Sequence, residues 1–165
     1  MIQRAPAARS VSLPTSVGIG EVAVAGVGSL LAAYGLGSCV GFVAWDPVTR
    51  VGGLAHFMLP SGSRAGSPAK YIDTGLPWFL DALSAAGLSS RRAQFKAAGG
   101  AAMFVGVSGS LEVGRRNVAA LDEALERAGL TLVAKDLGGA LGRSVELDIG
   151  TGRLSVRTIH GTSIL

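Results

Sequence analysis

The chain has 165 residues, of which 48% are hydrophobic and 16% charged, and its formal net charge is +4 at pH 7. This apolar content excludes wholesale disorder, and the length is that of one domain with a sizeable core. A single cysteine, Cys39, excludes an intramolecular disulfide framework, and two histidines, His56 and His160, are too few for a structural zinc cluster. The basic residues are scattered and aromatics reach only 5%, which argues against a nucleic-acid-binding module.

Residues 1–16 lack the continuous apolar segment of a signal peptide. They predict a flexible tail on a cytoplasmic protein, with residues 17–165 as one catalytic domain. No charged residue occurs between Glu21 and Asp46, which raises the alternative of a membrane span. Five glycines interrupt this run, and residues 34–39 have the composition of a turn. A pair of buried strands is therefore favoured over membrane insertion, because open strands leave unpaired backbone groups in a bilayer.

The first third of the domain is predicted to be β-structure. Residues 17–27 predict a first strand. Residues 38–45 and 51–58 are short runs of apolar and β-forming residues, separated by a proline-containing turn at residues 46–50. This arrangement predicts a β-hairpin.

Two helices are predicted in the middle of the chain. Ser67 as N-cap and Pro68 at the first helical position predict a helix that runs to about Ala86, with a kink or break at Pro77. Apolar residues at helical spacing predict a second helix over residues 115–128.

Further strands are predicted at residues 94–98 and 130–135, and a hairpin at residues 144–149 and 153–159. Blocks of strands are thus interrupted by two helices and do not alternate strictly with them. This order favours an α+β fold with a mixed or antiparallel sheet.

Cys39 and His56 are the candidate catalytic pair. Cys39 follows a glycine-rich turn and opens a strand, and His56 lies near the end of the next strand of the same hairpin. Cross-strand neighbours are roughly 5 Å apart, so the hairpin can bring thiol and imidazole into contact. A histidine beside a thiol lowers the thiol pKa and protonates the leaving group, and free N–H groups of the turn can hold an oxyanion. The alternative is a small buried hydrophobe beside a hydrogen-bonded core histidine.

Short motifs occur in order along residues 17–157: GLGSC at 35–39, DP at 46–47, GG at 52–53, HFMLP at 56–60, KYIDT at 70–74, AGGAAMF at 98–104, GRRNV at 114–118, DLGG at 136–139 and GRSV at 142–145. Together they resemble the CheD family, the chemoreceptor glutamine deamidases of bacterial chemotaxis.

The resemblance implies a cysteine hydrolase with a three-layer α/β/β fold, related to that of glutamine-deamidating bacterial toxins. It implies Cys39 as the nucleophile and His56 as the general base, with backbone support for the oxyanion at Gly37 and Ser38. The implied reaction converts receptor glutamine side chains to glutamate through a thioester. Family members also hydrolyse glutamyl methyl esters, and no metal or organic cofactor is implied.

Ala33 departs from the family pattern, which has a threonine six residues before the nucleophile. Because alanine has no hydroxyl, the orienting of the histidine is expected to pass to a backbone carbonyl, with the backbone of Ala33 itself as one candidate, to a water or to another side chain. Catalysis is therefore expected to be slower but not lost.

Asn117 and Thr74 are further candidates within the matched motifs. Asn117 either caps the second helix or lines the site. Thr74 either faces the cleft or belongs only to the first turns of its helix.

The resemblance also implies partners. These are methyl-accepting chemotaxis receptors, whose cytoplasmic regions are helical bundles, and a CheC-type phosphatase. The protein is expected in the cytoplasm, in association with receptor arrays. The missing threonine supports an alternative function, a weakened or inactive adaptor that binds receptors or a CheC-type phosphatase.

Overall fold

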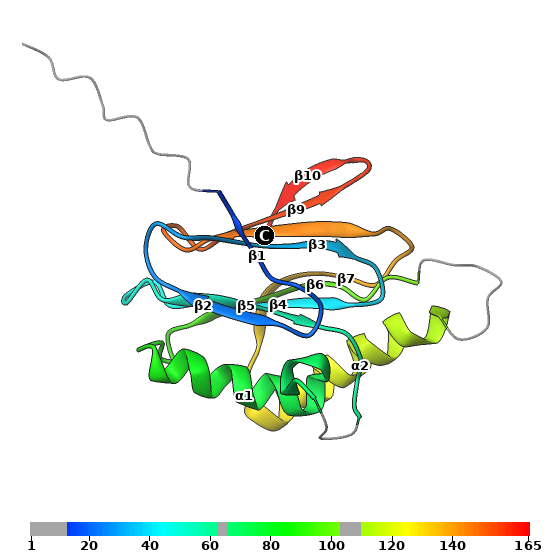
Figure 1. Cartoon of the computed structure of the whole chain (residues 1–165), viewed down its shortest axis with the longest axis horizontal. Helices are drawn as coiled ribbons and strands as arrows, with labels where there is room; N and C mark the ends of the chain where they lie inside the picture. The colour runs from blue at the N-terminus through cyan, green and yellow to red at the C-terminus, as the bar shows by residue number, and fades with distance from the viewer. Residues whose placement is uncertain (1–12, 63–65, 103–109) are drawn as a thin grey trace, which may run out of the picture.

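The computed structural model describes residues 13–62, 66–102 and 110–165. These residues form two five-stranded sheets and two α-helices, stacked in three layers (Figure 1). Sheet A is the outer layer and has the strand order β1 (Thr15–Ser16), β3 (Leu30–Leu36), β8 (Arg143–Asp148), β9 (Arg153–Thr158), β10 (Gly161–Ile164).

Sheet B is the middle layer and has the order β2 (Val22–Ala25), β5 (Gly52–Phe57), β4 (Val40–Trp45), β6 (Gln94–Gly99), β7 (Leu132–Leu137). The helices α1 (Ile72–Ala85) and α2 (Ser110–Ala128) cover its other face (Figure 1). Both sheets are mixed, because β1 runs parallel to β3 and β6 runs parallel to β7. The predicted α+β class with mixed sheets is therefore confirmed.

Sheet B separates two apolar cores. On its helix side, the side chains of Phe42, Phe57 and Phe79 form part of one buried cluster. On its other side, Val43 and Leu54 belong to a second cluster that also contains buried residues of sheet A. Strands covered on both faces need apolar residues at every position, which explains why β4 and β5 show no polar alternation.

The chain segment between Glu21 and Asp46, which has no charged residue, forms β2, β3 and β4. The segment is β-structure as predicted, but it forms three strands where a buried pair was expected, and β2 is only half-buried. Within the described ranges, no helix has the length and apolar character needed to cross a membrane.

The two predicted hairpins are confirmed. The strands β4 and β5 pair in antiparallel register from Val40↔Phe57 to Trp45↔Gly52. The strands β8 and β9 pair in the same way around residues 149–152. The short strand β10 was not predicted, because all four of its residues are exposed and show no apolar pattern.

The predicted first strand, residues 17–27, is divided between the two sheets. Val17 continues the pairing along sheet A, where its N–H donates to the carbonyl of Ala32 (2.7 Å). After a turn the chain enters sheet B as β2. Residues 1–12 of the predicted tail lie outside the described residues, whereas Thr15 and Ser16 form β1.

The first helix differs from its prediction at both its start and its proline. Pro68–Lys70 is a short 3-10 helix, and extended backbone at Tyr71 separates it from α1. The Ser67 side chain does not cap it, because its hydroxyl donates to the Gly20 carbonyl (2.8 Å). Pro77 is exposed in the second turn of α1, so its missing N–H removes one hydrogen bond without breaking the helix.

The second helix, α2, starts at Ser110, five residues before the predicted start at residue 115. The prediction relied on apolar spacing, which begins only at Val118.

Candidate active site

Cys39 and His56 lie at the same end of the β4–β5 hairpin. His56 pairs with Gly41, and Cys39 precedes Gly41 by two residues, so the two side chains belong to one face of sheet B. That face is turned toward sheet A, because the partly buried Cys39 packs against the cluster between the sheets. The structure therefore brings the predicted pair together as diagonal cross-strand neighbours.

The imidazole of His56 is buried and held by the segment before β2. The Gly20 N–H donates to the His56 carbonyl (2.8 Å), and the His56 N–H donates to the Glu21 carbonyl (2.9 Å). The ring nitrogen Nδ1 lies 3.1 Å from the carbonyl oxygen of Val17. Since a carbonyl can only accept, Nδ1 carries the proton and Nε2 is the free acceptor. Nε2 is buried and has no hydrogen-bond partner among the described residues.

Burial sets the protonation of both groups. It lowers the pKa of His56, against opposing effects of the Val17 carbonyl and the Glu21 charge. It also raises the pKa of the Cys39 thiol, although the backbone N–H of Cys39 acts in the opposite direction. Both directions favour the neutral forms of the thiol and the imidazole at neutral pH. That the histidine lowers the thiol pKa stays a prediction, since burial has the largest effect on this thiol.

Residues 37–39, which we call the nucleophile loop, have all three carbonyls occupied. The Gly37 carbonyl accepts from the Ala101 N–H (2.8 Å) and the Cys39 carbonyl accepts from the Gly100 N–H (2.8 Å). The Ser38 carbonyl accepts from the side-chain amide of Asn117. In the part of the chain that the structure describes, the N–H groups of Gly37 and Ser38 have no acceptor. These are the groups predicted to support an oxyanion.

Gly99 makes the close contact with this loop possible. Its φ of 116° lies in the region that favours glycine, and a Cβ there would collide with the Cys39 carbonyl. The AGGAAMF motif that carried part of the family resemblance thus contains the backbone groups that hold Cys39 and its neighbours.

Asn117 connects the two halves of the site. It is fully buried in the interior of α2, so it does not cap the helix. Its side-chain Nδ2 donates to the Ser38 carbonyl (2.7 Å) and to the Met58 carbonyl (2.9 Å). Gly114, one turn earlier, permits this approach, because a Cβ there would lie 2.5 Å from the Ala101 carbonyl oxygen.

Ala33 and Thr74 are placed away from these contacts. Ala33 is fully buried in β3, where it pairs with Val145 and packs between the sheets. The bond to the His56 ring comes from Val17 and not from Ala33, which corrects the expected backbone role of Ala33. The Thr74 hydroxyl donates to the Pro68 carbonyl (3.0 Å) within the turn that precedes α1.

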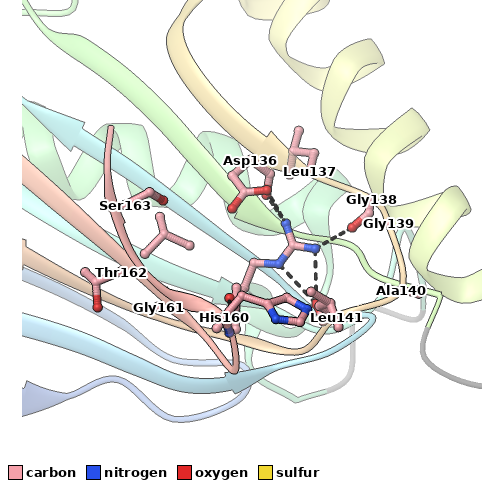
Figure 2. Close-up of a pocket in the computed structure, with 13 residues that line it drawn as sticks. Asp136, Leu137, Gly138, Gly139, Ala140, Leu141, His160, Gly161, Thr162 and Ser163 are labelled. Carbon is pink, nitrogen blue, oxygen red and sulfur yellow. Dashed lines mark hydrogen bonds and ion pairs between the residues drawn. The ribbon is translucent and has the colours of Figure 1, made fainter.

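A pocket of about 490 Å³ lies between the loop at residues 136–141 and the β9–β10 hairpin, and neither Cys39 nor His56 lines it (Figure 2). The Arg143 guanidinium in its wall donates to the carboxylate of Asp136 (2.6 Å) and to the carbonyls of Asp136, Gly138 and Leu141. These acceptors take up the N–H donors of Arg143. Its side chain therefore holds the loop at residues 136–141 in place and does not offer a site for an anion.

The loop at residues 136–141 in turn bonds the chain segment at residues 99–102, which holds the nucleophile loop. The Gly138 N–H donates to the Gly99 carbonyl (2.8 Å), and the Ala102 N–H donates to the Gly139 carbonyl (2.8 Å). For metal binding, no group of three His, Cys, Asp or Glu side chains with suitable placement is found among the residues described.

Sequence reasoning missed the Val17 carbonyl. A backbone carbonyl is present at every residue, so no side-chain signal distinguishes this one. The two carbonyls bound by Asn117 were missed for the same reason, although the asparagine itself was a candidate.

Comparisons with known proteins extend over most of the chain. A family model described as "CheD chemotactic sensory transduction" matches residues 58–158. A protein of Thermococcus kodakarensis named "Probable chemoreceptor glutamine deamidase CheD" is 42% identical over 157 residues, which cover 93% of this chain and 98% of the relative. A protein of Thermotoga maritima named "Chemoreceptor glutamine deamidase CheD" is 43% identical over 146 residues, which cover 88% of this chain and 92% of the relative.

Proposed function

The chain belongs to the CheD family, and we propose that it is a chemoreceptor glutamine deamidase that uses Cys39 as nucleophile and His56 as general base. The reaction is hydrolysis of a glutamine side-chain amide to glutamate and ammonia. The observation that carries the assignment of roles is the unpaired Nε2 of His56 on the Cys39 side of sheet B.

In the first half of the reaction, the Cys39 sulfur attacks the carboxamide carbon and its proton passes to Nε2 of His56. The carbonyl oxygen becomes an oxyanion, which the free N–H groups of the nucleophile loop stabilise. The carbon–nitrogen bond then breaks, and the amine takes the proton from His56 to leave as ammonia. A thioester on Cys39 remains.

In the second half, a water molecule attacks the thioester and gives a proton to Nε2. The carbon–sulfur bond breaks, the glutamate product leaves, and the sulfur of Cys39 regains the proton. The Val17 carbonyl holds Nδ1 throughout, and it stabilises the imidazolium that forms in each half.

The neutral resting state fits this mechanism. A buried thiol with a raised pKa is protected from adventitious reaction, and it transfers its proton only when a substrate carbonyl is in place. A histidine with a lowered pKa is already in the base form at neutral pH.

The proposal includes the partners that the family implies. The substrates are glutamines, and also glutamyl methyl esters, on the helical cytoplasmic bundles of methyl-accepting chemotaxis receptors. A CheC-type phosphatase is a second partner, and the protein acts in the cytoplasm at receptor arrays. The three-layer arrangement supports a relationship in fold to glutamine-deamidating toxins.

The test is incubation with a receptor signalling-domain fragment, followed by mass spectrometry of glutamine-to-glutamate conversion. Conversion by the wild-type chain, and none by Cys39→Ala, is expected. Hydroxylamine added during turnover should release receptor hydroxamate from the wild-type enzyme only, since it captures the thioester.

Absence of conversion above the Cys39→Ala background, with receptor binding retained, would instead support the adaptor function that the alanine at position 33 suggests. Conversion by Cys39→Ala equal to wild type would remove Cys39 as the nucleophile.

A further inference from the structure

The β4–β5 ladder ends one residue short of the nucleophile. Its last pair is Val40↔Phe57, so the next two residues, Cys39 and Met58, have no strand pairing with each other. At this point Asn117 supplies the connection, because its single amide group donates to the carbonyls of Ser38 and Met58. One side chain from α2 thus joins the nucleophile loop to the end of the strand that carries the histidine.

The bond to Ser38 also fixes the orientation of Cys39. The Ser38 carbonyl and the Cys39 N–H belong to one planar trans peptide, so they point in opposite directions. Asn117 draws the carbonyl toward the helix layer. The Cys39 N–H must then point toward sheet A, which is the side on which the thiol packs.

The Ser38 bond is the one support of the nucleophile loop, within the described chain, that a side chain provides. The bonds to the Gly37 and Cys39 carbonyls come from backbone N–H groups of Ala101 and Gly100. Because these donors are backbone groups, a change of side chain at Ala101 or Gly100 does not remove them. Asn117 is therefore the described side chain through which a substitution can change the position of Cys39.

The other half of the Asn117 amide is unusual for a buried side chain. Its Oδ1 is inaccessible to solvent and has no partner among the described residues. A buried acceptor without a hydrogen bond destabilises the fold. Among the described residues, its two donated bonds are thus the only use made of the polarity of this side chain.

We infer that Asn117 is a positioning residue for the deamidation site: its amide orients the Ser38–Cys39 peptide so that the Cys39 N–H and thiol face the substrate carbonyl together. This inference rests on the proposed function. It goes beyond the candidate pair because it gives a helix residue control over the orientation of Cys39.

The test compares Asn117→Ala and Asn117→Asp with a matched control, Leu125→Ala. Leu125 is buried in the same helix, two turns further on, and belongs to the core on the helix side of sheet B. Each variant is assayed below its own melting temperature for kcat and KM on the receptor fragment, and for the pH dependence of Cys39 alkylation by iodoacetamide.

Both Asn117 variants are expected to lower kcat roughly ten- to a hundredfold, because a small misplacement of the attacking thiol acts on the transition state. KM should change less than about twofold. Asn117→Asp keeps the shape but places a carboxylate against two carbonyl oxygens, so it should be no better than Asn117→Ala. The alkylation profile should shift to higher pH in Asn117→Ala, because the Cys39 N–H no longer faces the thiol. Leu125→Ala should melt earlier and keep the wild-type kcat and profile.

A kcat and an alkylation profile of Asn117→Ala that match Leu125→Ala would overturn the inference and leave Asn117 a purely structural residue. A wild-type kcat in Asn117→Asp would also overturn it, because shape would then be sufficient. If the wild-type chain does not deamidate the receptor, the proposed function fails, and the alkylation profiles still decide whether Asn117 positions Cys39.

Discussion

The two ends of the β4–β5 hairpin differ in whether the buried polar groups beside them are hydrogen-bonded. At the turn end, the Asp46 carboxylate is fully buried, and it accepts from the N–H groups of Val48 (2.9 Å) and Ser89 (3.0 Å) and from the Arg92 guanidinium (2.8 Å). At the open end, Nε2 of His56 and Oδ1 of Asn117 are buried without a partner among the described residues.

Buried polar groups are normally hydrogen-bonded, so a buried group without a partner indicates a role other than stabilising the fold. The Asp46 end is satisfied, and Arg92 with the surrounding N–H groups holds the pKa of its carboxyl well below the ordinary range. The His56 end keeps an acceptor free where a proton must arrive. With the proposed roles of Cys39 and His56, one hairpin has a structural end and a reactive end, and substitutions should separate activity from stability accordingly.

The largest expected effect is on the reactive end. His56→Ala should lower kcat by about a thousandfold, since it removes the proton acceptor. The matched control is His160→Ala, which changes the other histidine, an exposed one, and should leave kcat near wild type. Steady-state assays of both variants on the receptor fragment provide the measurement.

The pH profile sharpens this prediction. Because burial lowers the pKa of His56, the base form persists below the ordinary histidine value of about 6.5. The acid limb of kcat/KM for the wild-type enzyme should therefore lie below that pH. An acid limb above pH 7 would contradict the buried, neutral imidazole.

A smaller effect is expected at the structural end, and on stability instead of activity. Asp46→Asn should lower the free energy of unfolding by about 2 kcal/mol, because it weakens hydrogen bonds to a charged acceptor. The activity of the folded enzyme should not change. Denaturant unfolding and kcat measured on the same preparation test both statements, and a loss of kcat would erase the distinction between the two ends.

The same carboxylate predicts part of the acid sensitivity. A group whose pKa is lowered by folding stabilises the protein above its unfolded pKa, and the contribution is lost as the pH falls through the folded value. The wild-type chain should therefore lose stability progressively below about pH 4, and Asp46→Asn should show a shallower decline. Equal slopes in the two proteins would contradict this assignment.

The smallest effect is expected from Ala33→Thr. The Val17 carbonyl already holds Nδ1 of His56, so a hydroxyl at position 33 should raise kcat by no more than about fivefold. The melting temperature should fall, because Ala33 is fully buried and the added atoms crowd the core between the sheets. A tenfold or larger gain would show that the carbonyl alone orients the histidine poorly.

Local patterns were sufficient for the elements that flank the site. The hairpin at residues 38–58 was predictable because its strands are apolar runs joined by a proline-containing turn. That hairpin alone makes Cys39 and His56 neighbours, so the candidate pair followed from the sequence. By contrast, residues 17–27 gave one apolar pattern for a segment that the fold divides between two sheets. The place of the division is set by two hydrogen bonds: the Val17 N–H donates to the Ala32 carbonyl in sheet A, and the Gly20 N–H donates to the His56 carbonyl in sheet B.

The sequence by itself determined the fold class, the family and the pairing of a thiol with an imidazole, because each depends on side-chain identity or short-range spacing. The tertiary structure decided which ring nitrogen of His56 bonds the Val17 carbonyl, which groups hold the nucleophile loop, and that burial raises the pKa of the Cys39 thiol. These properties depend on backbone carbonyls and on burial. The Val17 carbonyl reaches His56 from 39 residues away, and the Asn117 amide reaches Ser38 from 79 residues away. A sequence pattern does not encode such contacts, because every residue carries the same carbonyl and only chain packing selects one of them.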